Sequence, residues 1–193
     1  MWVFYPYGEG VPAIATEADL KKELPVYFQS KLHPYKEALI QRARITDVGW
    51  WRLSEHRNWQ IARRPKIIST YFGKAGSFAL DRIGDFVVVQ GYGWQPKREG
   101  FTEQHLVAIV AMLNAPITNT LLAGVSNNLS GGQWNLSKRF IERMPLIDAQ
   151  KLPDLLLEPL SHIGEQMAKG ESWDPVALDR LARNALGLGM NVS

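Results

Sequence analysis

Three β-prone runs separated by very short connections constrain the fold of this chain more than any other feature of its sequence. The runs lie at residues 65–71, 77–81 and 86–90, and the segments between them are GKAG and RIGD. Glycine and aspartate at this spacing are typical of hairpin turns, because they tolerate the backbone conformations that tight turns require. We therefore expect these runs to form an antiparallel meander.

Helical patterns precede the predicted strands. Thr16 and Asp19 resemble the capping pair of a short helix. Apolar residues then recur at helical spacing from Pro25 to about Arg44. Pro34 is expected to break or restart this helix, because proline has no backbone N–H to donate to the preceding turn.

Further helical patterns follow the strands, and Thr102 is the candidate N-cap of the first of them. These helices are expected over residues 102–114, 116–125, 149–169 and 174–186. The order of elements predicts an α+β fold, in which a small, mostly antiparallel sheet is flanked by helices and followed by a C-terminal helical pair. We expect residues 1–147 to form one domain and residues 148–193 to form a helical segment.

Composition limits the class of protein. The chain has 193 residues, of which 46% are hydrophobic, and this is enough to bury a core. The absence of cysteine excludes disulfides and cysteine-ligated metal centres. No apolar run reaches the roughly 18 residues of a membrane span, and no signal-peptide pattern is present, so we expect a cytoplasmic protein with no membrane partner.

Charge is distributed unevenly along the chain. Nine Lys and Arg residues stand against three acids between positions 31 and 66, whereas seven acids stand against four bases from position 148 onward. The pattern predicts a basic face over residues 31–143 that can meet phosphate groups.

The stretch 126–147 joins a polar loop to a short basic helix, with the sequence SNNLSGGQWNLSKRFIERMPLI. Its Asn and Gln side chains can both donate and accept hydrogen bonds, and the paired glycines permit a sharp turn or a close approach. Ser137 is the candidate N-cap of the helix, Lys138 and Arg139 belong to its cationic face, and Pro145 ends it. Such a loop can recognise a polar edge.

Three tryptophans, at positions 50, 51 and 59, stand among cationic residues. One interpretation is that they are core anchors on which arginines stack. The other is that they form a nucleic-acid surface. The sequence leaves both interpretations open.

Motifs for catalysis and metal binding are missing. The four histidines have no second ligand at helical spacing, and no nucleophile elbow, phosphate-binding loop or dinucleotide fingerprint occurs. Asp81 and Asp85 flank a predicted turn, where acids are usually solvated. We therefore expect no metal, no cofactor and no self-contained catalysis in this chain.

The side chains that remain are suited to nucleic-acid recognition. Lys and Arg can neutralise phosphates and fix the register of a duplex. A Gln or Asn amide pairs with adenine and Arg pairs with guanine, and Gln133, Asn135 and Arg64 carry these groups.

Several segments resemble one known family. The segments are WWRL, PKII, GSFALD, GYGW, HLVAIVAMLNAPITNTLL and SGGQWNLSKRFIERMPL, in this order along residues 50–146. Together they resemble the C-terminal specificity domain of TaqI-like adenine-specific DNA methyltransferases, including fused restriction–modification enzymes. The last segment more distantly resembles the target-recognition domains of type I restriction specificity subunits.

The resemblance implies a module that binds duplex DNA and selects its sequence, while a separate catalytic domain with S-adenosylmethionine methylates an adenine. The Asn-Pro-Pro-Tyr-type tetrapeptide and the glycine-rich cofactor loop of such a catalytic domain do not occur here. The chain is therefore expected to be a fragment or a stand-alone specificity polypeptide that does not methylate alone.

The leading hypothesis places the DNA-binding residues in three segments of this sequence. They are Arg57, Arg63, Arg64, Lys66, Lys74, Ser77, Gln133, Trp134, Asn135, Lys138 and Arg139. The alternative is a protein–protein interaction module without DNA affinity, in which the tryptophans and the terminal helices bind a partner. A small enzyme with Asp81 and Asp85 in a pocket beside His105 is the third hypothesis.

Overall fold

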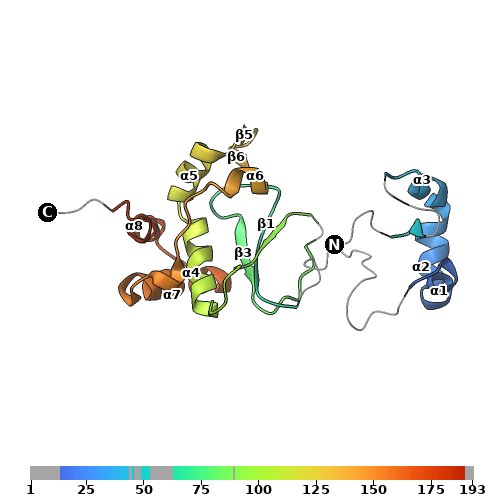
Figure 1. The fold of residues 1–193 in the computed structure, drawn as a ribbon, viewed down its shortest axis with the longest axis horizontal. Helices are drawn as coiled ribbons and strands as arrows, with labels where there is room; N and C mark the ends of the chain where they lie inside the picture. The colour runs from blue at the N-terminus through green and yellow to red at the C-terminus, as the bar shows by residue number, and fades with distance from the viewer. Residues whose placement is uncertain (1–13, 44, 46–48, 53–62, 89, 190–193) are drawn as a thin grey trace. The chain divides into compact units, whose positions relative to one another are not determined.

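The computed structural model describes residues 14–43, 45, 49–52, 63–88 and 90–189. The chain divides into two compact units, Met1–Ile61 and Ala62–Ser193, each with its own buried apolar cluster. The described part of the first unit is helical, and the second unit contains both sheets (Figure 1). This boundary differs from the expected one at residue 147, because the C-terminal helices contribute to the core of the second unit.

The first helix of the first unit, α1 (Glu17–Glu23), begins at a capping box. The Thr16 hydroxyl accepts a hydrogen bond from the Asp19 N–H at 3.1 Å, and the Asp19 carboxylate accepts one from the Thr16 N–H at 2.8 Å. Two of the N–H groups at the start of the helix are thereby satisfied. The predicted capping pair is confirmed.

The helical path after α1 changes its winding several times. It consists of α2 (Pro25–Tyr27), a π-helical turn (Phe28–Leu32), a 3₁₀ turn (His33–Tyr35) and α3 (Lys36–Ile40). The prediction of one helix to about Arg44 is wrong in length and regularity, whereas the predicted break at Pro34 is confirmed. Pro34 has no N–H to donate to the Ser30 carbonyl, so the α-helical ladder is interrupted there.

Two tryptophans anchor the core of the first unit. Trp50 and Trp51 are buried, and their rings meet edge to face at 5.8 Å. The Trp50 indole N–H donates to the Glu17 carboxylate at 2.9 Å, and the Arg52 guanidinium lies over the Trp51 ring. For these two residues the core-anchor interpretation is confirmed. Trp59 lies outside the described residues.

One sheet of the second unit has its first strand in the centre. It contains β1 (Lys66–Ser69), β3 (Phe78–Asp81) and β4 (Tyr92–Trp94), in the order β3-β1-β4, and both pairings are antiparallel. The predicted meander is therefore wrong, since the third strand is β4 and residues 86–88 form no strand. The N–H of Phe86 donates to the Asp81 carboxylate and is not available for a ladder.

The other sheet joins segments that are distant in the sequence. It contains β2 (Phe72–Gly73), β6 (Gln133–Asn135) and β5 (Asn128–Leu129), with β6 in the centre. The expected polar loop is thus a hairpin. Gly131 and Gly132 form its turn with φ values of +80° and +68°, a left-handed conformation that favours glycine.

The second unit also contains helices, the first of which lies against β3. They are α4 (Glu103–Asn114), α5 (Ile117–Val125), α6 (Lys138–Ile141), a 3₁₀ turn (Ala149–Lys151), α7 (Asp154–Lys169) and α8 (Pro175–Ala185). The Thr102 hydroxyl caps α4, as predicted. The fold class is α+β with C-terminal helices, which confirms the prediction.

No single helix among the described residues has both the length and the apolar character of a membrane span. Only α4 and α5 taken together meet those criteria, and they are bent by 77° at their junction.

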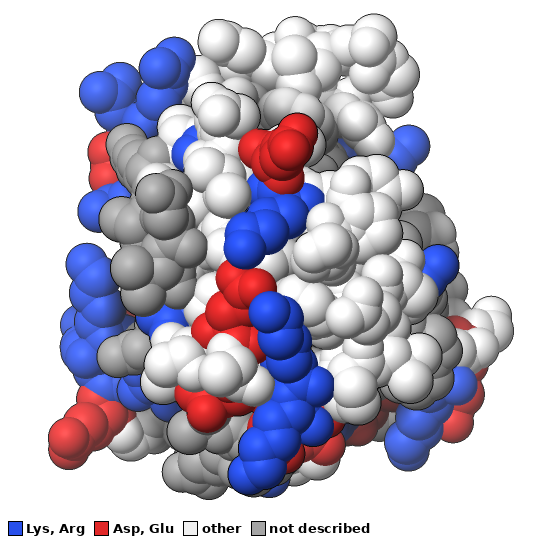
Figure 2. Space-filling model, turned by 90° about the vertical axis from the view of Figure 1, so that its right-hand side faces the viewer, with Lys and Arg blue, Asp and Glu red and all other residues white. Residues whose placement is uncertain are grey.

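Ion pairs join positions that are far apart in the sequence. Arg82 pairs with Glu103 on α4 and with Glu165 on α7, and Arg98 pairs with Asp148. On the face in Figure 2, Lys and Arg side chains are interleaved with Asp and Glu side chains.

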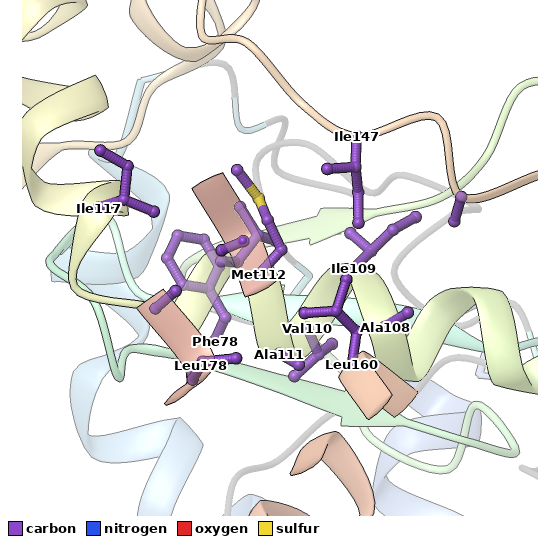
Figure 3. Close-up of a cluster of buried hydrophobic side chains, with 14 of the residues drawn as sticks. Phe78, Ala108, Ile109, Val110, Ala111, Met112, Ile117, Ile147, Leu160 and Leu178 are labelled. Atoms are coloured by element: carbon purple, nitrogen blue, oxygen red, sulfur yellow. The ribbon is translucent and has the colours of Figure 1, made fainter. Parts of the chain in front are cut away.

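The core of the second unit surrounds α4, which is buried on nearly all sides. Figure 3 shows its side chains between those of Phe78 on β3, Leu160 on α7 and Leu178 on α8. Gly164 of α7 makes this packing close, because a Cβ at that position would lie 2.5 Å from the Val107 Cγ1. The rigid part of the unit is thus the contact of α4 with β3 and α7.

Candidate nucleic-acid interface

The turn that carries Lys74 is fixed on two sides. The Lys74 N–H donates to the Ser77 hydroxyl at 3.0 Å, and the Ala75 N–H donates to the Asn119 Oδ1 of α5 at 3.0 Å. A Cβ at Gly73 would lie 2.9 Å from both the Leu136 Cδ1 and the Ser77 Cβ, so no side chain fits there. Lys74 is exposed on this fixed turn, whereas the Ser77 hydroxyl is used to hold it.

The pairing of β2 with β6 places Lys74 and Gln133 at the same end of this sheet. Gly73, the last residue of β2, is opposite Trp134, Lys74 directly follows Gly73, and Gln133 directly precedes Trp134. Gln133 is exposed at the start of β6. A cation and an amide from distant parts of the sequence therefore lie at one end of the β2–β6 pair.

Asn135 and Trp134 both make contacts within the fold. The Asn135 Oδ1 accepts a hydrogen bond from the Ser137 N–H at 2.9 Å, and the Trp134 ring packs against the apolar core. Ser137 is the N-cap residue of α6, as predicted, but its hydroxyl makes no capping bond. That Asn135 reads a base edge stays a prediction.

α6 presents two cations directly after this hairpin. Lys138 and Arg139 are exposed, and the Arg139 guanidinium lies 4.4 Å from the centre of the Phe140 ring. Neither has an ion-pair partner among the residues that the structure describes. The helix contains only four residues, so its charge comes from these side chains and not from its dipole.

Lys66 differs most from its expected role. Its side chain is 0% exposed, and its Nζ lies 2.7 Å from the Asp81 Oδ2. Burial opposes the charged form of Asp81, but hydrogen bonds from Lys66 and from the backbone outweigh it and hold the pKa of Asp81 below its ordinary value. Lys66 is therefore an internal partner and does not reach phosphates, and Asp81 is not a solvated turn residue.

Arg63 and Arg64 are exposed just before β1. They precede β1, whereas Lys74 follows β2, the next strand. Neither arginine has an ion-pair partner within the described ranges. Arg57 lies outside the described residues.

The described residues hold no arrangement typical of an active site. No group of three or more His, Asp or Glu side chains among them is placed to bind a metal ion. Asp81 is bound to Lys66, and the His105 Nδ1 accepts the Thr102 N–H at 3.0 Å. The third hypothesis, with these carboxylates beside His105, has no support from this geometry.

A pocket of about 340 Å³ lies between β4, α4 and residues 146–148. Its walls are mainly apolar and aromatic, with Trp94, Phe101 and Ile109 among them. Three charged residues belong to its lining: Arg98 and Asp148 are paired with each other, and Lys97 is exposed.

Comparison with known proteins adds no assignment. No protein-family model matches the chain, and no curated protein matches it significantly. The functional argument therefore depends on the residues and their geometry.

Proposed function

We propose that this chain is a sequence-specific DNA-recognition domain of an adenine-specific DNA methyltransferase or restriction–modification enzyme. Its task is to bind duplex DNA and to position a separate catalytic domain. The resemblance over roughly residues 2–147 supports this proposal, and so does the exposure of several cations and of the Gln133 amide.

The observation that carries the proposal is that Lys74 and Gln133 lie at the same end of the β2–β6 pair. The turn of Lys74 is fixed by Asn119 of α5 and by Ser77, so its ammonium can meet a phosphate at a defined place. From the same end of the sheet, the Gln133 amide can pair with the edge of an adenine.

Two roles follow for the exposed side chains. Lys138 and Arg139 extend the cationic contact beyond the hairpin, and Arg63 and Arg64 extend it to the residues just before β1. These contacts contribute affinity that does not depend on sequence. Gln133 contributes selectivity.

The test is fluorescence anisotropy with the full chain, first on a random duplex pool and then on duplexes selected from it. Lys138→Ala should weaken binding to all duplexes alike and reduce the slope of log K against log salt by about one. Gln133→Ala should leave that slope unchanged and relax the preference at one base pair, which is worth about 1–3 kcal/mol.

Lys169→Ala is the matched control, because Lys169 is an exposed lysine at the end of α7 and should leave both quantities unchanged. If the wild-type chain shows no duplex affinity at low salt, or if Lys169→Ala weakens binding as much as Lys138→Ala, the proposal fails.

The proposal also includes a methyltransferase catalytic domain, in cis or in trans, that holds S-adenosylmethionine in the cytoplasm. Methyl transfer to the selected duplex should require that domain. A methylation assay with this chain alone and with the catalytic domain added measures this requirement.

A second candidate function is a protein–protein interaction module. Leu155 on α7 and Val176 on α8 favour it, because their side chains are 82% and 75% exposed. Their replacement by serine should abolish partner binding and leave duplex affinity unchanged if they serve only this purpose.

A further inference from the structure

The backbone of the loop at residues 82–88 is held by the carboxylate of Asp81. The Asp81 Oδ1 accepts hydrogen bonds from the N–H groups of Gly84 and Asp85 at 2.9 and 3.2 Å, and the Oδ2 accepts one from Phe86 at 3.0 Å. The buried Lys66 ammonium lies 2.7 Å from the same Oδ2. Three consecutive backbone groups are therefore fixed to a charged pair in the interior.

The loop is also fixed from the side. Gly84 has a φ of +80°, and a Cβ there would lie 2.2 Å from the Arg64 backbone nitrogen. Only glycine permits so close an approach. Arg82, at the start of the loop, is held by Glu103 and Glu165. The loop thus lies directly against the backbone of residues 63–64.

This rigid loop presents apolar side chains. Ile83, Phe86 and Val87 are 66%, 65% and 37% exposed. Single exposed apolar residues are common, but three on one short, fixed loop form a patch that marks an interaction site. The charges beside the patch are the exposed Arg63 and Arg64, with the exposed Asp85 between the apolar residues.

We propose that Ile83 and Phe86 form an apolar wedge that inserts between base pairs of duplex DNA, while Arg63 and Arg64 bind the phosphates beside the insertion point. The inference rests on the proposed function. The two arginines have no ion-pair partner among the described residues, and their charge complements a phosphate backbone. DNA-bending proteins use apolar side chains in the same way to unstack a base step.

The fixed backbone explains why such a wedge is effective. A loop that is already held by Asp81 and Gly84 loses little conformational entropy when it inserts, so the cost that remains is mainly that of unstacking. The wedge lies against the backbone of residues 63–64, just before β1, and Gln133 begins β6 of the same unit. The unstacked step is therefore expected in the duplex site that Gln133 contacts.

The experiment uses the full chain and the duplex selected above, with 2-aminopurine in place of adenine at each position of the site in turn. Anisotropy reports binding, and 2-aminopurine fluorescence reports unstacking. Wild-type protein should raise the fluorescence several-fold at one step. The double variant Ile83→Ala/Phe86→Ala should lose most of this increase, while its affinity falls about tenfold or less.

Leu155→Ala is the matched control, because it removes an equally exposed apolar side chain from α7. It should retain the full fluorescence signal. The substituted side chains are exposed, so all variants should show the circular dichroism and the unfolding midpoint of the wild type, and these measurements exclude misfolding as the cause of any loss.

The outcomes separate the two proposals. Duplex binding without a fluorescence change at any step, or a full signal in the double variant, overturns the wedge and leaves the recognition function intact. Absence of duplex binding by the wild type overturns both. A further outcome is that the wild type self-associates without unstacking any base step and that the double variant abolishes this self-association. That result shows that the loop is a protein contact, and it overturns the wedge.

Discussion

Lys66 shows how one side chain can reverse an interpretation drawn from sequence. In a basic segment next to a predicted strand, a lysine is expected to be on the surface. The register of β1 with β3 instead places Lys66 opposite Asp81, and both side chains are buried. Sequence alone does not reveal this pair, because the pairing of the two strands decides which face of β1 is covered.

Asp81→Asn should destabilise the second unit by about 3–5 kcal/mol, because it leaves the Lys66 ammonium buried without a counter-ion. Urea unfolding followed by circular dichroism measures the effect. Asp85→Asn is the control, since Asp85 is exposed and its replacement should change the free energy of unfolding by about 0.5 kcal/mol or less. Equal effects of the two substitutions would contradict the structural role of the pair.

Glu17 provides a prediction about pH. Hydrogen bonds from Lys36, from the Trp50 indole and from Lys21 lower its pKa from 4.5 to about 2. A carboxyl with a lowered pKa in the folded state stabilises the protein at pH values above 4.5, and this contribution is lost as the pH falls toward about 2. Tryptophan fluorescence during acid titration should show the first unit losing stability in this range. Glu17→Gln should be less stable at neutral pH and should lose the dependence on pH between those limits.

At the scale of elements, the capped helices α1 and α4 follow from the sequence more directly than the sheets do. Thr102 and the apolar spacing of α4 were sufficient to predict that helix. The third strand was misplaced because the Asp81 side chain binds backbone groups that a strand would use. The β5–β6 hairpin was expected to be a loop, since its polar residues lack the alternation that marks a half-buried strand.

The candidate site, too, could be predicted from the sequence only in part. The exposed positions of Lys74, Gln133 and Lys138 agree with expectations drawn from the sequence. The contacts of Asn135 and Ser77 with neighbouring N–H groups were not predicted, because a polar side chain near a turn can serve either the backbone or a ligand.

Two glycines in helices should respond to alanine in opposite directions. Gly164→Ala should cost about 1–3 kcal/mol, because the new Cβ would overlap Val107 where α7 crosses α4. Gly124→Ala should stabilise the protein by up to about 1 kcal/mol, since Gly124 is an exposed residue of α5 with nothing within 4 Å of the new Cβ. Chemical denaturation of both variants tests the prediction, and the same sign for both would contradict the close packing at Gly164.

At the scale of the whole molecule, the two units have separate cores. The cluster around Trp50 and Phe28 shares no residue with the cluster around α4. The first unit is the smaller one, and Glu17 links Lys21, Lys36 and the Trp50 indole within it.

Calorimetry of the full chain should therefore resolve two unfolding transitions. Glu17→Gln should lower the temperature of one transition, and Asp81→Asn should lower the temperature of the other, because each substitution acts on one core only. If either substitution shifts both transitions equally, the units unfold as one cooperative body.

The central place of β6 between β2 and β5 has a consequence for biosynthesis. As the chain leaves the ribosome, β2 emerges long before its partner strand β6, and two helices, α4 and α5, are translated in between. The edge of β2 stays open during this interval. Lys74 and Gln133, which we propose to contact DNA, are thus brought together late in translation. A nascent chain that stops before β6 contains Lys74 but lacks Gln133, the residue to which we assign sequence selectivity.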